Sequence, residues 1–213
     1  MEIIDPVTLG DTSFSGGGGT YYDRNGALQT AAAGVPRVSY DPSDLAKAPY
    51  FLVEATATNL LRNSEGLVTD LDLSDLATTA TSTIAGFANA IRIGDNSTVT
   101  PYAYKQFATV VGTDYVFSIF LQMDDGLAPV VATTNLPGSP GDFMMVVQGD
   151  AWYYPSEVKS AGGGVFRVLV SFKATTTGLN YGIAKYTALS RRGMRITGFQ
   201  LETGTKVTSY IKT

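Results

Sequence analysis

Residues 115–122 read YVFSIFLQ, and this stretch decides the fold class because its side chains alternate between two faces. Successive side chains of a β-strand point to opposite faces of the sheet. A wholly apolar face of this length predicts a strand that packs against a core. That face carries Tyr115, Phe117, Ile119 and Leu121, and the opposite face carries Val116, Ser118, Phe120 and Gln122.

From residue 82 onward the whole chain has the texture of an all-β domain. Short segments rich in Val, Ile, Thr, Tyr and Phe are separated by Gly, Asn, Asp or Pro, as strands and turns prefer. No long helical pattern interrupts them, which disfavours parallel βαβ folds. We therefore predict an antiparallel jelly-roll β-sandwich over residues 61–213. The candidate strands are 83–93, 102–110, 115–122, 128–134, 143–148, 151–154, 165–175, 179–187, 194–202 and 207–211.

Residues 1–60 are predicted to form an extended N-terminal arm. Apolar clusters alternate with glycine and proline, including the linker-like run Gly16–Gly19, and residues 50–54 form the only plausible short strand there. The arm is too apolar for an indifferent tail and too broken to build its own core. We expect it to lie on the chain's own sandwich, on another subunit, or on the shell or tail of a larger assembly.

Composition excludes several classes of function. Formal net charge is -4, the pI is about 4.8, and no block of Lys or Arg signals nucleic-acid binding. Because Cys and His are both absent, Ser-His and Cys-His triads and ordinary zinc sites are excluded. No secretory signal or membrane-length apolar run is present, so we expect no membrane partner. Only 16% of residues are charged, which suits a surface largely covered by neighbours.

Six motifs stand near the two ends of the chain: YYDRNGALQTAAAGVPR at 21–37, YDP at 40–42, EATATNLL at 54–61, NSE at 63–65, GFQLE at 198–202 and TSYIKT at 208–213. Together these motifs resemble those of one family of tailed-bacteriophage proteins. Members of that family are head-fibre, head-spike, tail-fibre or carbohydrate-binding-like domains of phage virions, so the resemblance implies a virion protein. A tryptophan often precedes the Tyr-x-Phe-Ser strand in the family, whereas the only tryptophan here is Trp152.

Aromatic side chains are the candidate contacts for a ligand or a partner. Trp152 and Tyr154 share one face of a predicted short strand, and flat aromatic rings stack well on sugar rings or partner side chains. The alternative interpretation, favoured by the burial habits of aromatic residues, is that Trp152 packs into the sandwich. Within the arm, Tyr21, Tyr22 and Phe51 are the candidate partner contacts.

Charged side chains show no recognisable catalytic or metal-binding pattern, so we predict no catalytic residue, metal or cofactor. No glutamate context selects an acid and base pair. The aspartate groups are interpreted as solvated turn carboxylates, with calcium as the alternative. The arginine cluster is interpreted as a solvated edge, or as a contact for an acidic neighbouring capsid subunit. These residues are Glu54, Glu65, Glu157 and Glu202; Asp70, Asp72, Asp75, Asp124 and Asp125; and Arg191, Arg192 and Arg195.

These features support one principal functional hypothesis and one alternative. The principal hypothesis is a non-catalytic structural protein on the exterior of a phage particle, of the capsid-decoration, cement or head-fibre type. It would bind the major capsid protein or other virion proteins through its arm and form a homo-oligomer, with a trimer favoured. Its expected location is the virion, assembled in the host cytoplasm. The alternative is a tail or baseplate receptor-recognition module that binds host surface polysaccharide, and a hydrolase is disfavoured because no acid pair stands out.

Overall fold

The computed structural model describes most of the chain. The described residues are 18–52, 54, 57–66, 71–73, 77–80, 84–94, 101–131, 141–148, 151–178, 180–185 and 192–213, with the backbone alone at 77–80 and 151–152. Of the sequence predictions, Asp70, Asp75, Arg191 and residues 1–17 of the arm lie outside them. None of the described residues belongs to a helix that is long and apolar enough to span a membrane.

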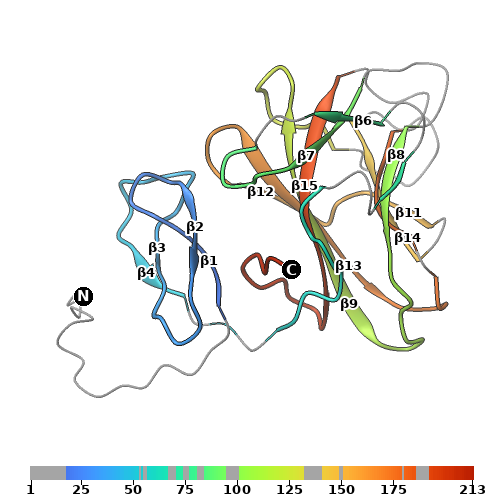
Figure 1. Ribbon diagram of the computed structural model, residues 1–213, viewed down its shortest axis with the longest axis horizontal. Helices are drawn as coiled ribbons and strands as arrows, with labels where there is room; N and C mark the ends of the chain where they lie inside the picture. Colours follow the sequence, from blue (N-terminus) through green and yellow to red (C-terminus); the bar gives the residue numbers. More distant parts are fainter. Residues whose placement is uncertain are drawn as a thin grey trace.

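Two antiparallel sheets pack face to face to form a sandwich (Figure 1). This confirms the predicted all-β, jelly-roll type of fold. The five-stranded sheet has the order β11 (Ala151–Tyr153), β10 (Met144–Val147), β14 (Asn180–Ala184), β8 (Tyr102–Gln106) and β5 (Asp72–Leu73). The six-stranded sheet has the order β12 (Glu157–Ser160), β13 (Val165–Lys173), β9 (Asp114–Met123), β15 (Met194–Thr203), β7 (Ala90–Ile93) and β6 (Ala77–Ala80).

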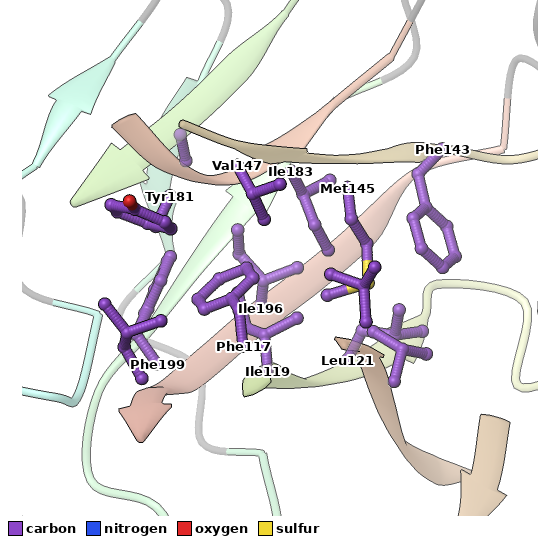
Figure 2. Close-up of a cluster of buried hydrophobic side chains, with 14 of the residues drawn as sticks. Phe117, Ile119, Leu121, Phe143, Met145, Val147, Tyr181, Ile183, Ile196 and Phe199 are labelled. Carbon is purple, nitrogen blue, oxygen red and sulfur yellow. The ribbon is translucent and has the colours of Figure 1, made fainter. Parts of the chain in front are cut away.

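The hydrophobic core lies between the two sheets, as the alternation in residues 115–122 predicts. Phe117, Ile119 and Leu121 of β9 are all fully buried and point toward the five-stranded sheet. There they approach Met145 of β10 and Ile183 of β14 (Figure 2). Burying each such side chain contributes about 1.5–3 kcal/mol. The register of β9 is therefore strongly specified, because a one-residue slip would turn the whole apolar set to the opposite face.

The outer face of the six-stranded sheet is covered as well. Ser118 and Phe120 point away from the core, yet they are buried. Phe120 packs in a second cluster with Phe87 and with Tyr210 of the C-terminal tail, which we define as residues 204–213. The predicted strand 207–211 is wrong, because the tail forms no strand. Side chains, rather than a neighbouring strand, bind its backbone.

Some predicted strands differ in extent from the observed ones, and some observed strands were not predicted. The strand predicted at 83–93 begins only at Ala90, because a turn closes with the Phe87 amide donating to the Ile84 carbonyl at 2.9 Å. The described part of 128–134 contributes one isolated bridge at Val131 instead of a strand. Strand β12 was not predicted because its sequence, EVKS, is charged and largely exposed, as suits a sheet edge.

A β-bulge in β15 depends on a glycine. The register of β15 against β9 shifts between Thr197 and Gln200. Gly198 lies inside this shift with φ +63°, and a Cβ atom there would lie 2.7 Å from the ring of Phe120. Only glycine satisfies both the left-handed backbone and the lack of space. The bulge directs Phe199 into the core while Gln200 faces outward.

Residues 19–51 form a small unit of short strands beside the sandwich, which we call the N-terminal unit (Figure 1). The Tyr40 amide donates to the Tyr22 carbonyl at 3.0 Å and joins its two hairpins. The sequence did not predict the first three strands because two to four residues are too few for alternation to be recognised. The pairs are β1 (Gly19–Tyr22) with β2 (Leu28–Ala31), and β3 (Val38–Ser39) with β4 (Tyr50–Phe51).

Candidate functional site

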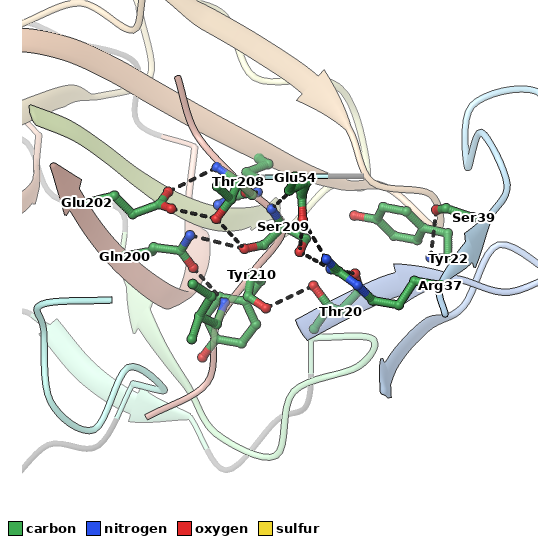
Figure 3. A network of polar contacts seen from close by, with 12 residues as sticks. Thr20, Tyr22, Arg37, Ser39, Glu54, Gln200, Glu202, Thr208, Ser209 and Tyr210 are labelled. Carbon is green, nitrogen blue, oxygen red and sulfur yellow. Dashed lines mark hydrogen bonds and ion pairs between the residues drawn. The ribbon is translucent and has the colours of Figure 1, made fainter. Parts of the chain in front are cut away.

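The N-terminal unit and the C-terminal tail meet the sandwich in a polar network, which we call the junction (Figure 3). At its centre the Glu54 carboxylate accepts hydrogen bonds from the Ser209 amide and hydroxyl, both at 2.6 Å, and from Arg37 Nη2 at 3.0 Å. Arg37 also donates to the Thr20 carbonyl at 3.1 Å. The junction comprises Thr20, Arg37, Glu54, Asn59, Ser64, Ser118, Arg167, Gln200, Glu202, Thr208, Ser209 and Tyr210.

The outward side chains of β15 bind the backbone of the tail. Gln200 donates through Nε2 to the Ser209 carbonyl at 3.1 Å, and its Oε1 accepts from the Ile211 amide at 2.7 Å. Glu202, which is 1% exposed, accepts from the Thr208 amide at 3.1 Å and from the Thr208 hydroxyl. Buried backbone groups without partners are costly. These side chains therefore replace the ladder that a neighbouring strand would provide.

Arg167 of β13 places a half-buried cation beneath the tail. Its Nη1 donates to the Thr208 carbonyl at 2.6 Å, and its Nη2 donates to the Ser118 hydroxyl at 2.9 Å. Its guanidinium carbon lies 5.3 Å from the centroid of the Phe120 ring, within cation–π range. Burial lowers the pKa of Arg167, and the nearby Glu202 carboxylate opposes that shift. Because the pKa of arginine is so high, the side chain keeps its charge here.

Tyr210 and Asn59 complete the junction. The Tyr210 carbonyl accepts from the Thr20 hydroxyl at 3.0 Å, and the Tyr210 hydroxyl shares a 2.6 Å hydrogen bond with Ser64 Oγ. Burial raises the pKa of Tyr210, so its phenol stays neutral. Asn59 donates to the Ile211 carbonyl at 3.0 Å. The tail is therefore bound on the outer face of the six-stranded sheet, and β1 of the N-terminal unit is bound to the tail.

The junction gathers residues from the motifs at both ends of the sequence. Thr20, immediately before the opening motif, and Tyr210, in the closing one, are 190 positions apart but hydrogen-bonded. Arg37 comes from the opening motif, Glu54 from the motif at 54–61 and Ser209 from the closing one. These side chains are bonded mainly to each other and to the backbone. The junction residues therefore help to close the fold.

Of the acidic residues that the sequence left open, all those described except Asp72 have structural partners. Glu54 and Glu202 belong to the junction. Glu65 and Glu157 pair with lysines, and Asp124 and Asp125 pair with arginines, although calcium was the alternative there. The prediction of a solvated arginine edge is wrong for Arg192 and Arg195, whose side chains are 25% exposed and paired with turn carboxylates. The pairs are Glu65–Lys212 (2.7 Å), Glu157–Lys159 (3.0 Å), Asp124–Arg92 (2.8 Å), Asp124–Arg195 (3.4 Å), Asp125–Arg192 (2.6 Å) and Asp142–Arg192 (2.6 Å).

The pKa of Asp125 falls to about 2, chiefly because Arg192 donates hydrogen bonds to it. Asp142, the other carboxylate bound by Arg192, is fully buried. Within the described part of the chain, no three acidic side chains come together in a way that could hold a metal ion.

The predicted aromatic contacts lie in two separate parts of the molecule. Trp152 belongs to the edge strand β11 and pairs with Val146, and its side chain lies outside the description. Tyr154 follows this strand and is 41% exposed. Tyr21 and Tyr22 belong to the N-terminal unit, on the opposite side of the molecule (Figure 1). The structure therefore does not join these residues into one site.

Tyr22 lines a small cleft between the N-terminal unit and the sandwich. The cleft has a volume of about 240 Å³, and Phe87 and Phe120 form part of its wall. Tyr22 is half-buried, and this burial raises its pKa to about 12. Tyr21 is half-buried as well, whereas Phe51 is exposed. Of the three arm aromatics, only Phe51 therefore presents much of its ring to a partner.

The N-terminal unit exposes a group of apolar side chains. Four of the nine large apolar side chains found exposed in the described part of the chain lie within residues 35–51. Phe51 was a candidate contact from the sequence, whereas Leu45 gave no signal because it is the only large apolar residue in PSDLAKAP at 42–49. The four are Val35 (52% exposed), Leu45 (43%), Tyr50 (48%) and Phe51 (38%).

Comparison with known proteins finds structural similarity only. No family model and no curated protein matches the chain. The fold is similar to the CBM22-1 xylan-binding domain of Paenibacillus barcinonensis Xyn10C, at 9% identity and a TM-score of 0.47, covering 73% of this chain and 100% of that one. It is also similar to the arabinose-bound MgGH51 α-L-arabinofuranosidase, at 9% identity and a TM-score of 0.46, covering 70% of this chain and 27% of that one.

A family 16 carbohydrate-binding module is similar at 10% identity and a TM-score of 0.38, covering 61% of this chain and 89% of that one. At these identities and scores the similarities say nothing of ligand or activity. The all-β sandwich is established by the strand pairing itself.

Proposed function

We propose that this chain is a non-catalytic binding protein of the exterior of a tailed-bacteriophage particle, of the capsid-decoration or head-fibre type. The N-terminal unit is its attachment element, and its partner is the major capsid protein or another virion protein. The resemblance at both ends of the sequence supports the virion location. A homo-oligomer, with a trimer favoured, is part of the proposal and is tested by sedimentation equilibrium.

The observation that carries the attachment role is the exposed apolar surface of the N-terminal unit. Val35, Leu45, Tyr50 and Phe51 present large side chains to solvent within one short segment. Grouped apolar exposure of this kind is typical of interaction surfaces. The Arg37–Glu54 pair binds this unit to the tail and hence to the sandwich. A partner that captured the unit would therefore hold the whole protein.

The test is co-sedimentation of the purified protein with phage particles that lack it. Tyr50→Ser together with Phe51→Ser removes two rings that are 48% and 38% exposed. Aromatic side chains bury about 150–250 Å² each, so covering these exposed parts removes roughly 150 Å² from water, or about 3–4 kcal/mol. We expect the affinity to fall by more than about a hundredfold.

The matched control is Val110→Ser together with Val111→Ser, which alters an adjacent exposed apolar pair, 65% and 56% exposed, on the sandwich. This variant should bind particles as the unaltered protein does. Absence of any binding to heads or tails, or an equal loss in the control, would show that the N-terminal unit is not an attachment element.

A further inference from the structure

A second cleft, in the sandwich itself, has a different chemistry from the surface of the N-terminal unit. It has a volume of about 610 Å³ and lies between the loop 60–63 and the strands β5 and β8. This volume falls in the range of about 300–1,000 Å³ that is usual for small-molecule sites. Its lining includes Leu60, Arg62, Asn63, Asp72, Gln106 and Phe107.

The loop that forms one wall is held firmly on both sides. The Leu60 amide donates to the Leu201 carbonyl at 2.8 Å, and the Leu61 amide donates to Asn59 Oδ1 at 3.1 Å. The Leu61 carbonyl accepts from the Thr213 hydroxyl at 2.7 Å, and the Leu61 side chain is 1% exposed. The exposed side chains between these anchors are therefore presented by a backbone that is already ordered.

The polar side chains of the cleft are uncommitted. Arg62, Asn63, Asp72 and Gln106 are all exposed, and within the described part of the chain none of them makes a side-chain hydrogen bond or ion pair. Arginines elsewhere in the sandwich have hydrogen-bond partners within the protein. Arg167, for example, donates to the Thr208 carbonyl and to the Ser118 hydroxyl. Four polar groups converging on one cavity without internal partners are available to a ligand.

Asn63 adds a sign of constraint at the same place. Its φ is +49°, and Gln148 is the only other non-glycine residue with positive φ among those described. A left-handed backbone conformation costs free energy in a residue that has a Cβ atom, although asparagine tolerates it better than most residues. Asn63 itself lines the cleft.

We propose that this cleft binds an uncharged saccharide. Amide, carboxylate and guanidinium groups are planar and offer paired donors or acceptors, which match the adjacent hydroxyls of a sugar ring. Leu60 and Phe107 are half-buried and offer apolar surface to its C–H groups. One exposed cation, Arg62, and one exposed anion, Asp72, balance at the rim. The inference is independent of attachment through the N-terminal unit, because the cleft belongs to the sandwich.

One further cation, Lys105, lines the cleft. It is 3% exposed, and its Nζ lies 5.9 Å from the centroid of the Phe199 ring. Its ammonium group therefore presents almost no surface to a ligand in the cleft.

The experiment screens the full chain against an array of neutral hexose and pentose oligosaccharides, with uronic-acid and sialylated glycans alongside. Hits are measured by isothermal titration calorimetry. Arg62→Ala, Asn63→Gly and Gln106→Ala should each weaken binding about tenfold, because each removes hydrogen bonds to the ligand. Asn63→Gly is the most informative variant, since glycine accepts the left-handed backbone and the fold should not weaken. Thermal melting confirms that each variant folds.

Tyr154→Ala tests the rival contact named from the sequence, because it removes an exposed ring in a different part of the sandwich. Binding at the cleft should survive this change. Absence of binding to every neutral oligosaccharide overturns the proposal. So does binding that Tyr154→Ala abolishes while the three cleft variants retain it, or binding restricted to the acidic glycans.

Discussion

Replacing Arg37 by methionine should loosen the N-terminal unit from the sandwich. The Arg37 side chain is 14% exposed and donates to Glu54 at 3.0 Å, to the Thr20 carbonyl at 3.1 Å and to Ser209 Oγ. Hydrogen bonds to charged groups contribute about 1.5–3 kcal/mol each and are not additive. Glu54 keeps its two donors from Ser209, and methionine keeps an apolar stem. We therefore expect the free energy of unfolding to fall by about 2–4 kcal/mol.

Urea denaturation and native-state hydrogen exchange measure this change. The Ser209 amide, which donates to Glu54 at 2.6 Å, should exchange faster in the variant, because the Glu54 carboxylate is no longer held in place. Arg24→Met is the matched control, because Arg24 is exposed on the same unit and should cost no more than about 0.5 kcal/mol. Equal losses in the two variants, or unchanged protection at Ser209, would refute the idea that Arg37 fastens the unit.

Three further predictions concern the sandwich and its cover. Gly198→Ala should cost about 3 kcal/mol in thermal denaturation, because it combines a left-handed backbone with a Cβ atom 2.7 Å from the Phe120 ring; a stable variant would contradict the bulge. Arg192→Met should cost about 3 kcal/mol because it leaves the fully buried Asp142 without its cation, and Asp142→Asn in the same chain should recover part of that loss. Burial raises the pKa of Tyr22 from 10.0 to about 12, so the unfolded chain loses this proton first and stability falls as the pH rises between those values. Tyr22→Phe should flatten this fall, measured as urea midpoints below pH 10 and near pH 12. An unchanged slope would contradict the burial of the phenol.

The alternation of apolar side chains along a strand could be recognised in the sequence because it depends only on residues close together in the chain. In residues 115–122 every second side chain is apolar, and the structure turns that face to the core. Alternation fails for β1 to β3, where two to four residues are too few, and for β12, whose charged side chains lie at an edge. The strand predicted at 207–211 was also wrong, because a segment with strand-like composition becomes a strand only if a neighbouring strand forms backbone hydrogen bonds with it. Gln200 and Glu202 offer side chains instead.

The candidate sites were less predictable than the fold. Phe51 was named from its aromatic character and is exposed on the N-terminal unit. Arg62, Asn63 and Gln106 drew no attention, because isolated polar residues in loops and at strand ends are common. Only the closeness of the loop 60–63 to β8 gives them a shared cavity.

The sequence by itself determined an all-β sandwich with an apolar face on its central strand, and it excluded chemistry that needs cysteine or histidine. It also marked both ends of the chain as a pair of motifs. Only the tertiary structure decided what those motifs do, since Thr20 and Tyr210 lie 190 positions apart and meet on the outer face of one sheet. The physical reason is that alternation depends on neighbours along the chain, whereas a half-buried carboxylate such as Glu54 is satisfied by whichever donors the fold brings to it.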